Sequence, residues 1–121
     1  TAHAGFGGTE YMLPGVFSEG TRRGLSPNKI AELTAWAPSR RFGLLSKGDI
    51  AEGFDADLAL IDPDERWIIR AEDSPSTQGY TPFEGIEVTG RVKTTFLRGR
   101  KAFDSGTVLG QPDGRYVRRP G

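Results

Sequence analysis

The stretch of sequence that decides the fold is Lys47-Gly48-Asp49-Ile50-Ala51-Glu52-Gly53-Phe54-Asp55-Ala56-Asp57-Leu58-Ala59-Leu60-Ile61-Asp62-Pro63. It begins with a basic residue followed by glycine, which is typical of a turn, and continues through a short polar loop. Its second half has a period of two, with apolar residues on both faces of an expected strand: Ala56, Leu58 and Leu60 on one, Ala59 and Ile61 on the other. This pattern predicts a strand that is covered on both sides and that ends at a turn, Asp62-Pro63-Asp64.

A helical spacing of apolar residues precedes this stretch. Ser26 is a suitable N-cap and Pro27 suits the first helical position, so we expect a helix to begin there. One apolar stripe follows at spacings of three and four, formed by Ile30, Leu33 and Ala37. Pro38 is expected to end this helix, and a short turn that Gly43 closes should follow it.

The two ends of the chain differ in their expected structure. A short helix is expected over Thr9–Glu19, and Pro14 would kink or restart it. Near the other end, residues 92–97 and 101–104 are expected to pair as antiparallel strands across a two-residue turn, Arg98-Gly99. The chain therefore reads as helices first and a small antiparallel sheet afterwards, without the alternating strand-helix series of a complete α/β fold.

The composition restricts the classes of protein to which the chain can belong. The sequence has 121 residues, enough for one domain, and its 16 basic residues balance its 16 acidic residues. The zero net charge gives no support to a nucleic-acid partner or to binding at an anionic membrane. The absence of cysteine excludes disulfides and thiolate metal sites and fits a reducing compartment. Because no apolar run approaches the ~20 residues that span a bilayer, we expect no membrane partner and a cytoplasmic location.

A series of further motifs accompanies the stretch at 47–63. In chain order they are Phe6-Gly7-Gly8-Thr9-Glu10, Ala37-Pro38-Ser39-Arg40-Arg41-Phe42-Gly43-Leu44, Thr81-Pro82-Phe83-Glu84-Gly85, Gly90–Arg100 and Arg115-Tyr116-Val117-Arg118-Arg119. Each motif alone is weak, but together they cover nearly the whole chain. The series resembles the C-terminal portion of the cyclic amidohydrolases, the group of dihydroorotases, allantoinases and hydantoinases.

This resemblance implies an α+β architecture. The helices would come from the end of a (β/α)8 metal-dependent hydrolase barrel, and part of a small antiparallel β-sandwich would follow them. Residues 1–46 would be the end of the barrel domain, with its last-strand loop and terminal helices. Residues 47–108 would belong to the β-sandwich, and residues 109–121 would form an extended C-terminal tail.

The resemblance also implies a function for a longer parent protein. Members of the family are several times longer than this chain, so we expect a fragment of a hydrolase that opens small cyclic amides. The parent would bind zinc or another pair of divalent metal ions, whereas no cofactor is expected in this chain. We expect the isolated chain to be inactive. Without the other strands of the sandwich, an apolar face along Leu58 and Leu60 would stay open, which favours a homo-oligomer or strand exchange.

The candidate site residues lie at the start of the chain. Thr1-Ala2-His3-Ala4-Gly5 resembles a family segment in which a metal-bound catalytic aspartate precedes a histidine. In this alignment Ala2 stands at the aspartate position, and the catalytic residue of the chain is unknown. The other possibility is that the alignment is shifted and the aspartate lies before Thr1. The resemblance implies that His3, Gly7 and Gly8 bind the substrate. Alternatively, His3 is a packing or surface residue, and the two glycines form a plain turn.

Two other functions stay open at this point. Ala2 would suit a non-catalytic homologue that uses the same fold for assembly. An unrelated β-rich interaction module is a further alternative, but it leaves the ordered motifs unexplained.

Other residues that could carry chemistry have simpler structural interpretations. Two pairs of aspartates are expected to cap turns: Asp55 with Asp57, and Asp62 with Asp64. Three aromatic residues are expected to fill the sheet core (Trp67, Phe96 and Phe103), and three serines are expected to lack a catalytic partner (Ser18, Ser26 and Ser39). The C-terminal arginines are expected to be solvated (Arg115, Arg118 and Arg119).

Overall fold

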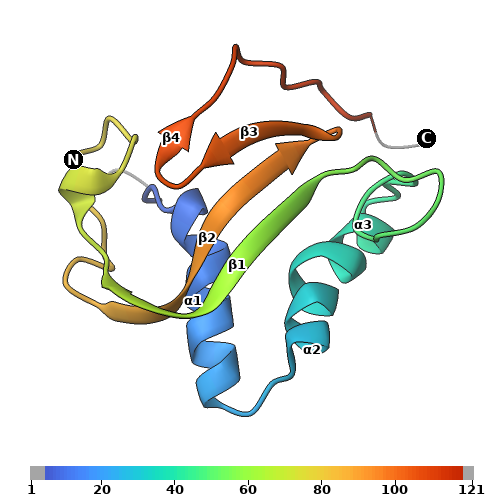
Figure 1. Ribbon diagram of the computed structural model, residues 1–121. Coiled ribbons are helices and arrows are strands. Elements are labelled where there is room, and N and C mark those ends of the chain that lie inside the picture. Colours follow the sequence, from blue (N-terminus) through green and yellow to red (C-terminus); the bar gives the residue numbers. More distant parts are fainter. Residues whose placement is uncertain (1–4, 119–121) are drawn as a thin grey trace.

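The structure, a computed structural model, describes residues 5–118 (Figure 1). Ala2, His3 and Arg119 therefore lie outside the described residues. In chain order the elements are α1 (Thr9–Arg22), α2 (Pro27–Ala31), a π-helical segment (Glu32–Trp36), α3 (Ala37–Arg41), β1 (Leu58–Ile68), a 3-10 turn (Ala71–Asp73), β2 (Glu87–Leu97), β3 (Arg100–Asp104) and β4 (Thr107–Val108). Helices thus precede an antiparallel sheet, as the sequence predicts.

Helix α1 is longer than expected and is not interrupted by proline. It runs from Thr9 to Arg22 with Pro14 inside it, so the helix does not restart at Pro14. Proline removes one N–H from the helical ladder, and burial of the Pro14 ring contributes favourably in the opposite direction. The buried face of the helix also contains Tyr11 and Phe17.

The helical segment after residue 26 begins as predicted but does not end at Pro38. The Ser26 hydroxyl accepts a hydrogen bond from the Lys29 amide at 3.2 Å, and Pro27 takes the first helical position. Before Pro38 the chain widens into a π turn, in which the Ala37 amide donates to the Glu32 carbonyl. A wider turn accommodates a residue that cannot donate, so the helix continues to Arg41.

The sheet has the strand order β1-β2-β3-β4, and every neighbouring pair is antiparallel. The predicted two-residue turn between β2 and β3 is confirmed, with positive φ angles of 47° at Arg98 and 78° at Gly99. The turn predicted at Asp62-Pro63-Asp64 is instead a bulge inside one long strand β1. The Asp62 carboxylate accepts bonds from the amides of Asp64 and Glu65, which lets the strand resume.

Strand β1 is not covered on both sides, contrary to the sequence pattern. Ala59 and Leu60 are consecutive, so their side chains point to opposite faces of the sheet, yet both are exposed. Leu60 keeps 52% of its surface and Ile68 keeps 43%. Two apolar faces in a sequence predict two covering layers, and the described residues do not supply both of them.

The core lies between α1 and the ends of β1 and β2. Tyr11, Ile69 and Val88 are buried together, with Trp67 and Phe83 packed against them. Figure 1 shows α1 lying across the sheet at β1 and β2. The two layers are also joined by a hydrogen bond, in which the Ser18 hydroxyl accepts from the amide of Thr89 at 3.0 Å. The start of α1 is therefore fixed relative to the connection between β1 and β2.

An ion-pair cluster ties the Lys47–Pro63 stretch to the far end of the sheet. The Lys47 ammonium pairs with Asp55 at 2.9 Å and also with Asp57. The second oxygen of Asp57 accepts from the Arg98 amide at 2.7 Å. Burial raises the pKa of Asp57, but the bonds from Lys47 and from the Arg98 amide outweigh it and leave the pKa below its ordinary value. Hydrogen bonds from Lys47 and then Ser46 likewise lower the pKa of Asp55.

The backbone conformation and the packing at position 48 require the glycine that follows the lysine in this stretch. Its φ is +84°, and a Cβ there would lie 2.6 Å from both the Ala35 carbonyl oxygen and the Ser39 Cβ. Ser39 is buried and donates its hydroxyl proton to the Trp36 carbonyl at 2.7 Å, so it has little freedom to move. The turn is thus packed directly onto the end of the helical segment.

We expect Gly48→Ala to destabilise the fold by about 2–4 kcal/mol, the sum of positive-φ strain and overpacking. Gly53→Ala is the matched control, because Gly53 has a φ of +85° but a Cβ there would meet no atom within 4 Å. It should cost only the strain, about 1–2 kcal/mol. Urea unfolding measures both variants, and equal losses would contradict the packing argument.

We expect acid to remove the contribution of the Lys47 cluster. The pKa values of Asp55 and Asp57 are lower in the folded state than their ordinary 3.8, so the stabilisation is complete above that pH and falls as pH drops below it. Asp57→Asn should be less stable at neutral pH and should lose less stability between pH 5 and pH 3.

Urea unfolding at a series of pH values measures this slope. Asp49→Asn, which changes an exposed carboxylate outside the cluster, should keep the slope of the unchanged protein. An Asp57→Asn slope equal to that of the unchanged protein would exclude this cluster as the acid-sensitive contact.

Candidate functional site

The glycine loop, residues 5–8, leads directly into α1. Gly5 and Gly8 both have positive φ angles, 84° and 144°, which residues with a side chain rarely adopt. The Gly8 carbonyl accepts from the Tyr11 amide at 2.9 Å and so starts the helix. Gly8 is the N-cap residue and provides no side-chain cap. The predicted substrate-binding residues Gly7 and Gly8 therefore lie together at the beginning of α1, whereas His3 and Ala2 lie outside the described residues.

A loop from the sheet half of the chain, the 74–83 loop between β1 and β2, lies over the glycine loop. The Gly7 amide donates to the side-chain oxygen of Gln78, and the Ser74 hydroxyl donates to the Glu10 carboxylate. Phe83 makes edge-to-face contacts with the rings of Phe6 and Tyr11, with centroids 6.0 and 6.2 Å apart. Segments some 70 positions apart in sequence thus form one surface.

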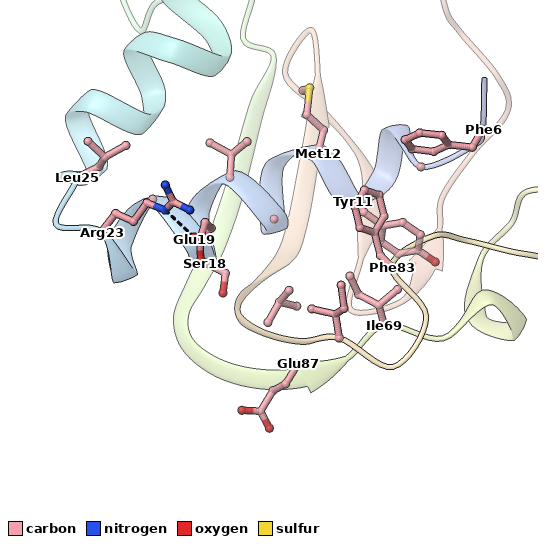
Figure 2. A pocket seen from close by; sticks show the side chains of 16 residues that line it. Phe6, Tyr11, Met12, Ser18, Glu19, Arg23, Leu25, Ile69, Phe83 and Glu87 are labelled. Carbon is pink, nitrogen blue, oxygen red and sulfur yellow. Dashed lines mark hydrogen bonds and ion pairs between the residues drawn. The ribbon is translucent and has the colours of Figure 1, made fainter. Parts of the chain in front are cut away.

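An open groove of about 770 Å³ continues from this surface along α1 (Figure 2). At one end Phe6, Tyr11 and Phe83 form an aromatic wall, and Figure 2 shows Met12 and Ile69 beside them. Side chains that line the groove are mainly apolar. Such a surface can hold an apolar group or an apolar face of other polypeptide, but it supplies few polar atoms for chemistry.

The other end of the groove holds a charged cluster. Glu19 accepts from Arg22 at 2.6 Å and from Arg23 at 2.5 Å. These bonds, that from Arg22 first, lower the pKa of Glu19 to about 2. The carboxylate is therefore ionised throughout the neutral range, and an acid this strong is a poor proton acceptor.

The other acidic residues whose pKa values are lowered are also paired with basic partners. Glu65 pairs with Lys93 at 2.7 Å and Arg91 at 3.1 Å, and the bond from Lys93 is the main reason why its pKa lies below the ordinary value. Asp113 pairs with Arg98 at 2.7 Å and Arg100, which lowers its pKa and anchors the C-terminal tail. These pairs hold the sheet together and leave none of these carboxylates placed as a general base.

The serines considered in the sequence have structural partners. Ser18 bonds to the Thr89 amide, Ser26 caps a helix, and Ser39 bonds to the Trp36 carbonyl. Trp67 packs against the core and donates its indole N–H to the Gly90 carbonyl at 3.1 Å. The interpretation of these residues as structural is consistent with these contacts.

The metal implied by the resemblance does not fit the residues described here. Across residues 5–118, no group of three or more histidine, cysteine or acidic side chains could hold a metal ion. We therefore derive no chemical step that passes through a metal in this part of the chain. None of the helices in the same range has both the length and the apolar character needed to cross a bilayer.

The contacts from Gln78 to Gly7 and from Ser74 to Glu10 were missed by the sequence reasoning. A Ser-, Pro- and Gly-rich run predicts a loop but gives no direction for its side chains. The only signal in the sequence was that the loop runs into the Thr81–Gly85 motif, which the resemblance already marked.

Comparison with known proteins supports the motif series. The chain matches the amidohydrolase family over residues 6–102. It is 44% identical over 118 residues to an allantoinase of Rubrobacter xylanophilus, covering 97% of this chain and 26% of that protein. It is 45% identical over 93 residues to a dihydroorotase of Methanothermobacter thermautotrophicus, covering 77% of this chain and 21% of that protein.

The fold agrees with these sequence matches. A solved structure of D-hydantoinase superposes with a TM-score of 0.90 at 35% identity, covering 95% of this chain and 26% of that one. The chain thus spans about a quarter of the length of the curated relatives it matches. Its similarity in sequence and in structure extends over nearly all of its own length, and the chain belongs to the amidohydrolase family.

Proposed function

We propose that this chain is the C-terminal portion of a metal-dependent hydrolase that opens the ring of a small cyclic amide. The observation that carries the proposal is the match over 118 residues to a protein named allantoinase, joined by matches to a dihydroorotase and a D-hydantoinase. Proteins with these names are hydrolases of cyclic amides. The helices then correspond to the end of a (β/α)8 barrel, and the sheet to part of a β-sandwich.

The contribution of this segment to the reaction is binding and not proton transfer. The Gly7 amide donates to Gln78, so we assign the donation to the oxygen atoms of a cyclic amide to the other backbone amides of the glycine loop. The acidic groups with lowered pKa values are engaged by arginine and lysine, as described above. The general base and the divalent metal ions belong to residues outside 5–118, and the substrate specificity depends on them as well.

This proposal predicts that the 121-residue chain alone opens no ring, whereas the full-length protein does. The assay measures hydrolysis of dihydroorotate, allantoin and a 5-substituted hydantoin, each with and without added zinc. Turnover by the isolated chain with zinc would contradict the assignment of the chemistry to other residues. Inactivity of the full-length protein on all three rings with metal present would contradict the enzyme and favour a non-catalytic homologue with a role in assembly.

We also propose that the isolated chain self-associates through the exposed apolar side of the sheet. Leu60 keeps 52% of its surface, and a large apolar side chain gains ~1.5–3 kcal/mol on full burial. Leu60→Lys should therefore shift the chain toward monomer in sedimentation velocity. Leu33→Lys, which changes a leucine of 46% exposure on the helical segment, is the control and should leave the distribution unchanged.

A clean monomer at high concentration before any substitution would show that this surface does not cause association. The same conclusion would follow if both lysine variants shifted the distribution equally. A cytoplasmic location is proposed with the function and is tested by fractionating cells that express the full-length protein.

A further inference from the structure

We propose that Gln78 is a positioning residue: its side-chain oxygen holds the Gly7 amide and keeps the glycine loop in its substrate-binding shape. The inference rests on the proposed function, because it gives this loop a role in binding the cyclic amide. The 74–83 loop, which connects β1 and β2, would then help to shape the site at the start of α1.

The 74–83 loop contacts the chain at two points, near the end of the glycine loop and in the first turn of α1. Gln78 accepts from the Gly7 amide, and two residues into the helix Glu10 accepts from the Ser74 hydroxyl. Two bonds that flank a short segment fix its orientation as well as its position. Between them, Gly8 starts α1 through its carbonyl, so any movement of the loop would also disturb the first turn of the helix.

The glycine loop and the 74–83 loop approach each other closely at Gly7. A Cβ at Gly7 would lie 3.2 Å from the Gln78 amide carbon and 3.3 Å from the Ser76 hydroxyl oxygen. At Gly5, by contrast, a Cβ would meet no atom within 4 Å. A side chain at position 7 would therefore displace the side chains of the 74–83 loop, Gln78 first.

The backbone of Gln78 is held by hydrogen bonds within its own loop. Within its loop the Ser76 amide donates to the Ser74 hydroxyl at 3.1 Å, and the Gln78 amide donates to the Ser76 hydroxyl at 3.4 Å. Thr81 is buried, and the loop is closed behind it by a bond of 2.6 Å from the Ala71 amide to Glu84. A chain of short turns therefore presents Gln78 to the glycine loop.

The energetic reason for such a contact is the flexibility of glycine. A loop with two glycines at positive φ loses much conformational entropy when it is ordered. If Gln78 orders the glycine loop before the substrate binds, the entropy cost of ordering the loop no longer reduces the affinity for substrate. Removing the acceptor should therefore weaken binding and leave the chemical step nearly unchanged.

The test uses the full-length protein with Gln78→Met, which keeps the length of the side chain but removes the acceptor. Gln78→Glu keeps an acceptor oxygen and should restore the contact. Gln111→Met is the matched control, since Gln111 is the other glutamine of the chain and lies exposed in the C-terminal tail. Two quantities are measured: hydrogen exchange of peptides covering residues 5–11, and KM and kcat for an uncharged cyclic amide.

We expect Gln78→Met to speed exchange in residues 5–11 and to raise KM about threefold to tenfold, the effect of one ordinary hydrogen bond, with kcat changed less than about twofold. Gln78→Glu should return both readouts toward their original values, and Gln111→Met should alter neither. Unchanged exchange in Gln78→Met would overturn the proposal, as would a loss confined to kcat or a failure of Gln78→Glu to restore the contact.

The two readouts separate this inference from the proposed function. Exchange is measured without substrate, so it reports on the contact between Gln78 and Gly7 even if no ring is opened. Faster exchange in a protein that is inactive on every ring would leave the contact standing and reject the proposed function. Normal activity with unchanged exchange and KM would reject the positioning role alone.

Discussion

The packing of α1 against β2 is the contact on which the rest of the structure depends. Phe17 lies where Gly90 has no side chain, at a φ of +105° that favours glycine, and Tyr11 is buried with Ile69 and Val88. This contact brings together two halves of the chain that are far apart in sequence. Without it the glycine loop would have no fixed relation to the 74–83 loop, and the candidate site would not exist as one surface.

The charged residues have a consistent role in this arrangement. Lys47 with Asp57 closes a loop, Glu65 with Lys93 joins β1 to β2, and Asp113 with Arg98 joins the C-terminal tail to the hairpin turn. Their carboxylates have lowered pKa values because basic partners hold them ionised. The charges of this segment therefore connect β1 with β2 and the sheet with the C-terminal tail.

Residues 5–118 leave an apolar groove open along α1 and apolar positions exposed on β1. The chain spans about a quarter of those proteins, and its two-faced strand pattern predicts more covering layers than residues 5–118 provide. Predictions from the pattern were correct where local geometry decides, as at the Ser26 cap and the Arg98-Gly99 turn. They were wrong where tertiary packing decides, as at Pro38 and Asp62-Pro63.

The sequence by itself determined the order of helices and strands, the hairpin turn and the membership of the amidohydrolase family, because these follow from local spacing and ordered motifs. It also marked Gly7 and Gly8, whose role in binding substrate stays a prediction. Only the tertiary structure decided that the Gly7 amide donates to Gln78. The same is true of the ion pair of Lys47 with Asp57 and of the hydrogen bond from the Arg98 amide to Asp57. The physical reason is that side-chain direction in a loop depends on what packs around it, and no local pattern in the sequence records that.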